Sequence, residues 1–268
     1  MAGTIIVNAD DFGKSESINA AIAECFDKGI IKRTTLMVNM PAADAAVALA
    51  KEKGFFEQVG IHLNLTEGRP LTKEIQNNPL ICDEKGSFHA GFQKTMKYRL
   101  YMDELTISQI RTELNAQLQK YMEYGLKLMH VDSHHHVHTN YPVLRALKPL
   151  AKEYGFSSIR LGRNLYHGGN PLMRLYKCWY NHAIKKMCRT TTDYFGSFKD
   201  LAAYFSISIA ELEKQESSAV SQLTTDKIDE FLNQNRLEIM VHPMYNEQGI
   251  LVDTDIKTAV ETRLLNKK

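Results

Sequence analysis

Short apolar runs alternate with amphipathic stretches of helical length along most of the chain. Residues 4–9 (TIIVNA) have the length and apolar character of a strand, and residues 18–26 carry apolar side chains at the i, i+3, i+4, i+7, i+8 spacing of a helix. Further strands are predicted at 34–39, 58–65, 128–132, 157–161 and 238–242, and further helices at 42–53, 107–124 and 143–154. This alternation predicts right-handed crossovers and a parallel sheet, either open or closed into a barrel.

Two long stretches interrupt the alternation. Residues 67–103 are rich in turn-forming residues, and residues 163–205 are rich in tyrosine and include Gly168 and Gly169. Each is too long to be a plain connection between neighbouring elements. Long excursions of this kind are typical of substrate loops or lids, and we interpret both in that way.

Polar side chains stand where the predicted strands end. In parallel sheets and barrels the carboxyl ends of the strands lie on one side of the protein, and that side holds the active site. Outside the histidine-rich run described next, the set consists of Asn8, Asp10, Asp11, His62, Asn64, Arg160 and His242. Several separate strands therefore deliver polar or ionisable groups to the same rim.

Residues 130–138 read HVDSHHHVH and contain five of the ten histidines in the chain. If the strand stays regular, His130, Asp132, His134 and His136 share one face, because side chains alternate with period two. The run could be a solvated surface segment, but other strands deliver a carboxylate and a further histidine to the same edge. A carboxylate and two imidazoles can bind a divalent metal and leave positions open for water and substrate, so we favour a metal site.

The pair Asp10 and Asp11 precedes Phe-Gly at the end of the first predicted strand. A turn is the simplest interpretation of such a pair, and Asp-Phe-Gly is also the magnesium motif of protein kinases. A kinase would need a nucleotide-binding lobe upstream, where only ten residues stand. Adjacent carboxylates at a strand end point in different directions, so one can bind metal while the other takes a proton.

The composition is that of an ordinary globular protein. Lysine plus arginine is 33 and aspartate plus glutamate is 31, with no long basic run, so we expect no nucleic-acid partner and no anionic membrane surface. No apolar window reaches the length of a membrane span, and the first residues do not read as a signal peptide. The four scattered cysteines are expected to be reduced thiols in a cytoplasmic protein. The oligomeric state is left open, with a homodimer as one option.

Four motifs together carry a family resemblance: NADDFG at 8–13, GIHLNLTEGRPL at 60–71, HVDSHHHVH at 130–138 and VHP at 241–243. In this order they resemble the YdjC-like family of chitooligosaccharide deacetylases. The resemblance implies an α/β fold, an irregular TIM-like (β/α) barrel related to polysaccharide deacetylases. It also implies a single domain over 1–268, with excursions at about 67–103 and 163–205.

The activity implied by the resemblance is removal of an N-acetyl group from small chitin-derived sugars, typically phosphorylated chitobiose. Carried over by motif position, the metal ligands are Asp11, His62 and His134, and Asp10 is the general base. Strand geometry alone does not separate His134 from His136, and motif position decides for His134. The cofactor is one divalent ion. The donors suit zinc, cobalt, manganese or ferrous iron better than magnesium, whereas the resemblance points to magnesium or a mixed preference, and we expect zinc or magnesium.

Further roles follow from the chemistry of amide hydrolysis. His242 is the candidate acid for the departing amine because imidazole titrates near neutrality, although it could also be a core histidine beside Pro243. Arg160 is expected to bind substrate phosphate or to support Asp10, and Asn64 is a second expected substrate contact. His130 and Asp132 are candidates for orienting a ligand imidazole.

The segment 163–189 brings basic and aromatic side chains together and is a candidate site for a sugar phosphate, although a solvated helix would look the same. Two alternative functions are considered. A metal-dependent phosphoester hydrolase with two metal ions would need more carboxylates at the strand ends than the sequence offers. A non-catalytic sugar-binding module would not need Asp10, His62 or His242, all of which are present. A non-haem iron oxygenase shares the ligand types but usually has a different fold.

Overall fold

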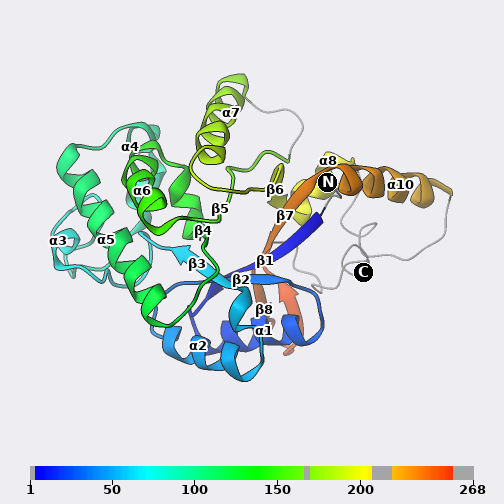
Figure 1. Ribbon diagram of the computed structural model, residues 1–268, viewed down its shortest axis with the longest axis horizontal. Coiled ribbons are helices and arrows are strands. Elements are labelled where there is room, and N and C mark those ends of the chain that lie inside the picture. Colours follow the sequence, from blue (N-terminus) through cyan, green and yellow to red (C-terminus); the bar gives the residue numbers. More distant parts are fainter. Residues whose placement is uncertain (1–3, 166–169, 207–218, 256–268) are drawn as a thin grey trace.

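A sheet of seven parallel strands forms the centre of the computed structural model, which describes residues 4–165, 170–206 and 219–255, without the side chains of 219–226 (Figure 1). The order across the sheet is β5-β4-β3-β2-β1-β7-β6. The strands are β1 (Thr4–Phe12), β2 (Arg33–Leu36), β3 (Val59–Leu63), β4 (His130–Ser133), β5 (Ser158–Ile159), β6 (Tyr194–Ser197) and β7 (Arg236–Val241). Parallel pairing throughout agrees with the predicted alternation of strand and helix.

Helices connect the strands and cover the sheet. The α-helices are α1 (Glu16–Asp27), α2 (Ala43–Glu52), α3 (Lys73–Gln76), α4 (Met96–Leu100), α5 (Glu104–Glu123), α6 (Tyr141–Tyr154), α7 (Pro171–Lys185), α8 (Phe198–Tyr204) and α10 (Ala219–Gln234). Short 3₁₀ helices are η1 (Phe56–Gln58), η2 (Ala90–Lys94) and η3 (His134–Thr139), and β8 (Pro243–Tyr245) pairs with β9 (Leu251–Asp253) in an antiparallel hairpin. Helices α3 to α6 gather beside β3 and β4, whereas α8 and α10 lie at the β6–β7 end (Figure 1).

The two edge strands, β5 and β6, are joined by flanking segments instead of a regular ladder. Thr190 donates its backbone N–H to the carbonyl of Ser157 at 2.9 Å, and Ser158 forms an isolated parallel bridge with Thr190. Asn164 and Leu165 donate their backbone N–H groups to the carbonyl of Phe195. The α/β class and an irregular, TIM-like arrangement are therefore confirmed.

Local sequence explains where the elements start and stop. β1 is buried over its last six residues, as expected for a central parallel strand covered on both faces. Ser15 caps α1, because its hydroxyl accepts a hydrogen bond from the N–H of Ile18. Gly155 ends α6 in the left-handed conformation that glycine adopts without steric cost (φ 64°).

The histidine-rich run departs from the expected strand. β4 ends at Ser133, and the following residues form η3, in which His135 and His136 have left-handed backbone angles (φ 52° and 55°). The expectation that His134 and His136 share the strand face of Asp132 is therefore wrong, because the chain turns immediately after the strand.

The two excursions contain more regular structure than the sequence pattern predicted. Residues 67–103 include α3, η2 and α4, and residues 163–205 include α7, the strand β6 and α8. β6 was missed because its four residues, YFGS, give too short an apolar run to stand out from the tyrosine-rich segment. Gly168 and Gly169 lie outside the described residues.

No helix in the described ranges combines the length and apolar character that a bilayer span requires. The four cysteines are free thiols, as expected from their scattered positions.

Candidate active site

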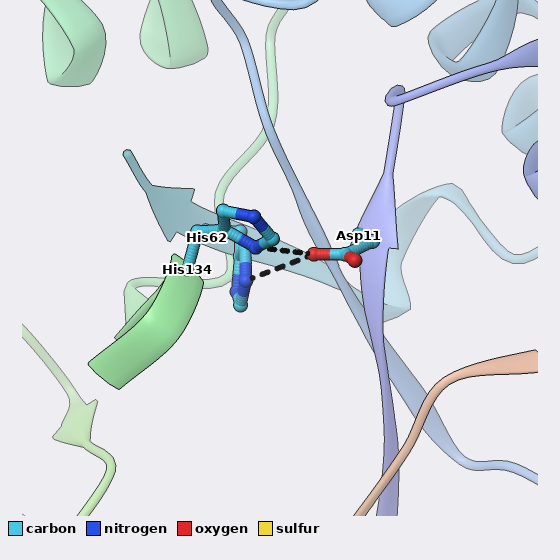
Figure 2. A group of neighbouring side chains, drawn as sticks. All are labelled: Asp11, His62 and His134. Carbon is cyan, nitrogen blue, oxygen red and sulfur yellow. Dashed lines mark ion pairs between the residues drawn. The ribbon is translucent and has the colours of Figure 1, made fainter. Parts of the chain in front are cut away.

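Three side chains meet at the carboxyl ends of strands of the same sheet: Asp11 from β1, His62 from β3 and His134 directly after β4 (Figure 2). Asp11 Oδ1 lies 2.8 Å from Nδ1 of His134 and 3.3 Å from Nε2 of His62. All three residues are buried. The structure thus brings together the three residues that motif position had selected as metal ligands.

An irregularity in β1 gives Asp11 its direction. The pairing register between β1 and β2 shifts between Ala9 and Phe12, and Asp11 has a positive φ of 68°. Such bulges re-aim side chains out of the regular alternation of a strand. Asp10 and Asp11 therefore serve different neighbours although they are adjacent in sequence.

His62 is held between two carboxylates. Its Nδ1 lies 2.7 Å from Asp132 Oδ1 and 3.2 Å from the hydroxyl of Thr35, which leaves Nε2 facing Asp11. Burial lowers the pKa of His62, but the Asp132 and Asp11 carboxylates outweigh burial and raise it to about 10. Asp132 thus orients His62 as expected, whereas Nδ1 of His130 is hydrogen-bonded to the hydroxyl of Ser158.

His134 is also fixed on both sides of its ring. Its Nε2 lies 3.0 Å from Oε2 of Glu67, and the same carboxylate oxygen pairs with Nζ of Lys14 at 2.8 Å. The ring of His135 lies 4.0 Å from that of His134. Sequence reasoning did not single out Glu67, although it stands inside the motif GIHLNLTEGRPL that carried the resemblance.

Asp10 lies beside this group in a buried ionic network. Arg160 NH1 and NH2 bond the two Asp10 carboxylate oxygens at 2.6 and 2.7 Å, and Arg160 also pairs with Asp132 and Glu238. The guanidinium lies over the ring of Phe195. Burial raises the pKa of Asp10, but Arg160 outweighs burial and holds it well below the ordinary range. Asp10 is therefore ionised at all physiological pH values.

The surroundings of Arg160 and Asn64 favour positioning roles over the substrate contacts suggested by the sequence. Arg160 is 0% exposed and its charge is already matched by carboxylates. Asn64 is also 0% exposed. Its amide donates to the carbonyl of Glu67 at 2.7 Å and its Oδ1 accepts from the N–H of Thr66, so it shapes the loop that carries Glu67.

His242 follows β7 and stands on the open side of Asp10. Its Nε2 lies 3.9 Å from Asp10 Oδ2, and its Nδ1 lies 3.8 Å from Asp255 Oδ2. Its side chain is 27% exposed, and its backbone N–H donates to Asp253. His242 therefore lies at the site rim, between Asp10 and solvent, and not in the core.

Among the described residues, four groups of side chains have the donors and spacing to hold a metal ion, and they differ in local charge. Two of them are Asp10-His62-Asp132 and His130-Asp132-Glu238. Their carboxylates already pair with the positively charged Arg160, which disfavours binding of a metal cation at the same place. The His242-Asp253-Asp255 group includes an exposed member.

The Asp11-His62-His134 group fits a divalent ion best. Its ligand atoms lie within 4.8 Å of one another, and Asp11 Oδ1 is buried without a hydrogen bond of good geometry. One carboxylate and two imidazoles are a common donor set for catalytic metals. His138 bonds Ser133 and the carbonyl of Arg160, and His136 packs against Phe195, so neither joins the group.

Comparison with known proteins places these residues in a family. A profile described as YdjC-like protein matches residues 4–267. A carbohydrate deacetylase of Clostridium beijerinckii is 34% identical over 92% of this chain and 84% of its own length, and one of Thermoanaerobacter pseudethanolicus is 29% identical over 98% and 91%.

A more local match reaches a higher identity. A carbohydrate deacetylase of Brevibacillus brevis is 41% identical over 56% of each chain. A crystal structure from Enterococcus faecalis V583, of a protein assigned to cellobiose-phosphate cleavage, superposes with a TM-score of 0.61 at 22% identity, covering 92% of this chain and 84% of that one. That likeness supports the fold. With the family profile covering nearly its whole length, this chain belongs to the YdjC-like protein family.

Proposed function

We propose that the protein is a metal-dependent carbohydrate N-deacetylase, which hydrolyses the acetamide of a small chitin-derived sugar, with phosphorylated chitobiose as the expected substrate. The observation that carries the proposal is the buried Asp11-His62-His134 group with Asp10 and His242 beside it. Relatives named carbohydrate deacetylase that align over most of the chain support the same reaction. The free cysteines agree with a cytoplasmic location.

Hydrolysis of an amide needs an activated nucleophile, a stabilised oxyanion and a proton for the departing nitrogen. Asp11, His62 and His134 would hold one divalent ion, zinc or magnesium. When bound, such an ion supplies Lewis acidity, which polarises the amide carbonyl and makes water a stronger acid. Glu67 and Asp132 would hold the two imidazoles in place.

Asp10 is proposed to accept the proton of the attacking water. Because Arg160 lowers the pKa of Asp10, this carboxylate is a weak base that can take a proton only from an acidified donor. The same ion pair fixes both carboxylate oxygens in space, so Asp10 presents a defined acceptor. His242, on the solvent side of Asp10, is proposed to give a proton to the departing amine.

Product analysis tests the proposal. The metal-loaded protein is incubated with diacetylchitobiose and with its phosphate ester, and released acetate and the mass of the sugar are measured. We expect one acetate per free amine formed, with activity lost in His62→Ala. Release of inorganic phosphate without acetate would instead identify a phosphoester hydrolase and reject the deacetylase.

A further inference from the structure

A pocket of about 180 Å³ opens beside the candidate metal group. Its walls come from η3, from both excursions and from α7, and they include His135 and His136. The ring of His135 lies against that of His134, so the pocket begins next to the metal group. The pocket therefore stands where a sugar would extend away from a reacting acetamide at the metal group.

Three cations from separate segments line this pocket: Arg99 of α4, Arg163 after β5 and Lys177 of α7. No carboxylate is among the described residues that line it. Asp200 pairs with one of these cations, its Oδ2 lying 3.3 Å from NH1 of Arg163. Burial lowers the pKa of Lys177, and the two arginines lower it further against the opposing effect of Asp200. The pocket therefore has a net positive potential.

Two further features of the wall suit a sugar ligand. The Nδ1 atom of His136 is buried and has no hydrogen-bond partner, so a polar group in the pocket could satisfy it. Tyr176 lines the same wall and offers an aromatic face for the apolar C–H surface of a sugar ring. The left-handed backbone of His135 and His136 turns this segment from the metal group toward the pocket.

We propose that Arg99, Arg163 and Lys177 form an anion subsite that binds a phosphate monoester on the sugar, while the acetamide lies at the metal group. This proposal rests on the proposed deacetylase function and names the residues that would determine which sugar the enzyme prefers. Arginine and lysine both bind phosphate, arginine through its planar fork and lysine as a point charge. Of the basic residues expected from the sequence, Arg174 and Lys185 do not line this pocket. They line a second pocket on α7, which Lys177 also borders.

Substitutions that remove one charge each test the subsite. Arg99→Gln and Lys177→Gln should lower kcat/KM for the phosphorylated N-acetylated disaccharide by about tenfold or more, the loss typical of a hydrogen bond to a charged group. The same variants should change kcat/KM for the unphosphorylated disaccharide by less than twofold. Arg174→Gln and Lys185→Gln are the matched controls and should leave kcat/KM for both disaccharides unchanged. Raising the salt concentration should reduce the preference of the wild-type protein for the phosphorylated sugar.

A binding measurement separates this proposal from the proposed function. Calorimetric titration with N-acetylglucosamine 6-phosphate and with N-acetylglucosamine should show tighter binding of the phosphate ester by wild type, and loss of that difference in Arg99→Gln and Lys177→Gln. If this pattern is found but no sugar releases acetate, the subsite stands and the deacetylase proposal fails. If acetate is released but both variants keep the wild-type difference in affinity and in kcat/KM between the two sugars, the subsite is rejected and the deacetylase proposal stands.

Discussion

His134 and Glu67 form a contact that joins a candidate metal ligand to the loop after β3, with Nε2 and Oε2 3.0 Å apart. The other ring nitrogen, Nδ1, faces Asp11. A carboxylate behind a ligand imidazole fixes its tautomer and raises its basicity. Glu67 is therefore positioned to prepare His134 for metal binding through Nδ1.

Glu67→Gln should weaken metal affinity by about 10–100-fold, the usual cost of losing such a partner. Competition with a chromophoric chelator measures the affinity directly, without reference to turnover. Glu74→Gln, a change at an exposed glutamate of α3, is the control and should bind metal like wild type. Unchanged affinity in Glu67→Gln would show that His134 does not depend on this carboxylate.

The adjacent aspartates should separate into two roles. Asp11→Asn should lose metal, because Asp11 is the carboxylate of the ligand group. Asp10→Asn should retain metal but lose turnover by about 10²–10⁴-fold, the contribution typical of a general base. Metal content by atomic emission and kcat by acetate release distinguish the two, and equal metal loss in both variants would contradict the assignment.

Asp10→Asn also removes one partner of a fully buried arginine, so its stability must be measured in parallel. A thermal unfolding scan shows whether reduced turnover reflects reduced folding. Turnover corrected for the folded fraction is the quantity that the prediction concerns.

Removal of metal should abolish acetate release and leave the protein folded. The ligands stand on β1, β3 and the end of β4, whose ladders do not depend on the ion. The far-UV circular dichroism of chelated protein should match that of loaded protein, with a lower Tm because bound metal stabilises the native state. Full turnover in protein shown to be free of metal would refute the metal site.

The free energy of unfolding should fall as the pH drops from about 4.5 toward 2, in part through Glu238. Burial raises the pKa of this carboxyl, but Arg33 and Arg160 outweigh burial and lower it to about 2. A carboxyl with a depressed pKa in the folded state stabilises the protein above its ordinary pKa, and this contribution is lost as the pH falls through the lowered value.

Glu238→Gln should be less stable than wild type at neutral pH and should lose less stability on acidification. Urea unfolding at several pH values between 5 and 2 measures both effects. Glu84→Gln, at an exposed loop position, should keep the wild-type pH dependence. An identical slope in Glu238→Gln and wild type would show that Glu238 does not titrate with a lowered pKa.

Regular alternation made the central strands and the rim predictable from the sequence. β1 and β3 carry apolar residues before their polar ends, so the strand pattern located Asp11 and His62 correctly. β6, with four residues inside a tyrosine-rich segment, had too little pattern to be found. The left-handed backbone conformation of His135 and His136 could not be predicted either, because residue type alone does not determine it.

Side-chain pairing in the interior was the least predictable part of the site. The sequence placed Arg160 at a strand end, where it could equally contact solvent, substrate or Asp10. Only the fold shows that it is enclosed among Asp10, Asp132 and Glu238. Glu67 lies on a loop after β3, so its approach to His134 depends on how the loop folds back, which Asn64 governs.

The turn at η3 has a consequence for how this protein can change over evolutionary time. A single residue separates His134, at the metal group, from His136, in the wall of the cation-lined pocket. Mutations that reshape the pocket by moving this turn would also displace His134, the candidate metal ligand, so their effects would not add to those of mutations at the candidate metal group. Arg99 and Lys177 of the proposed anion subsite lie on other segments, so substitutions there would change that subsite without moving His134.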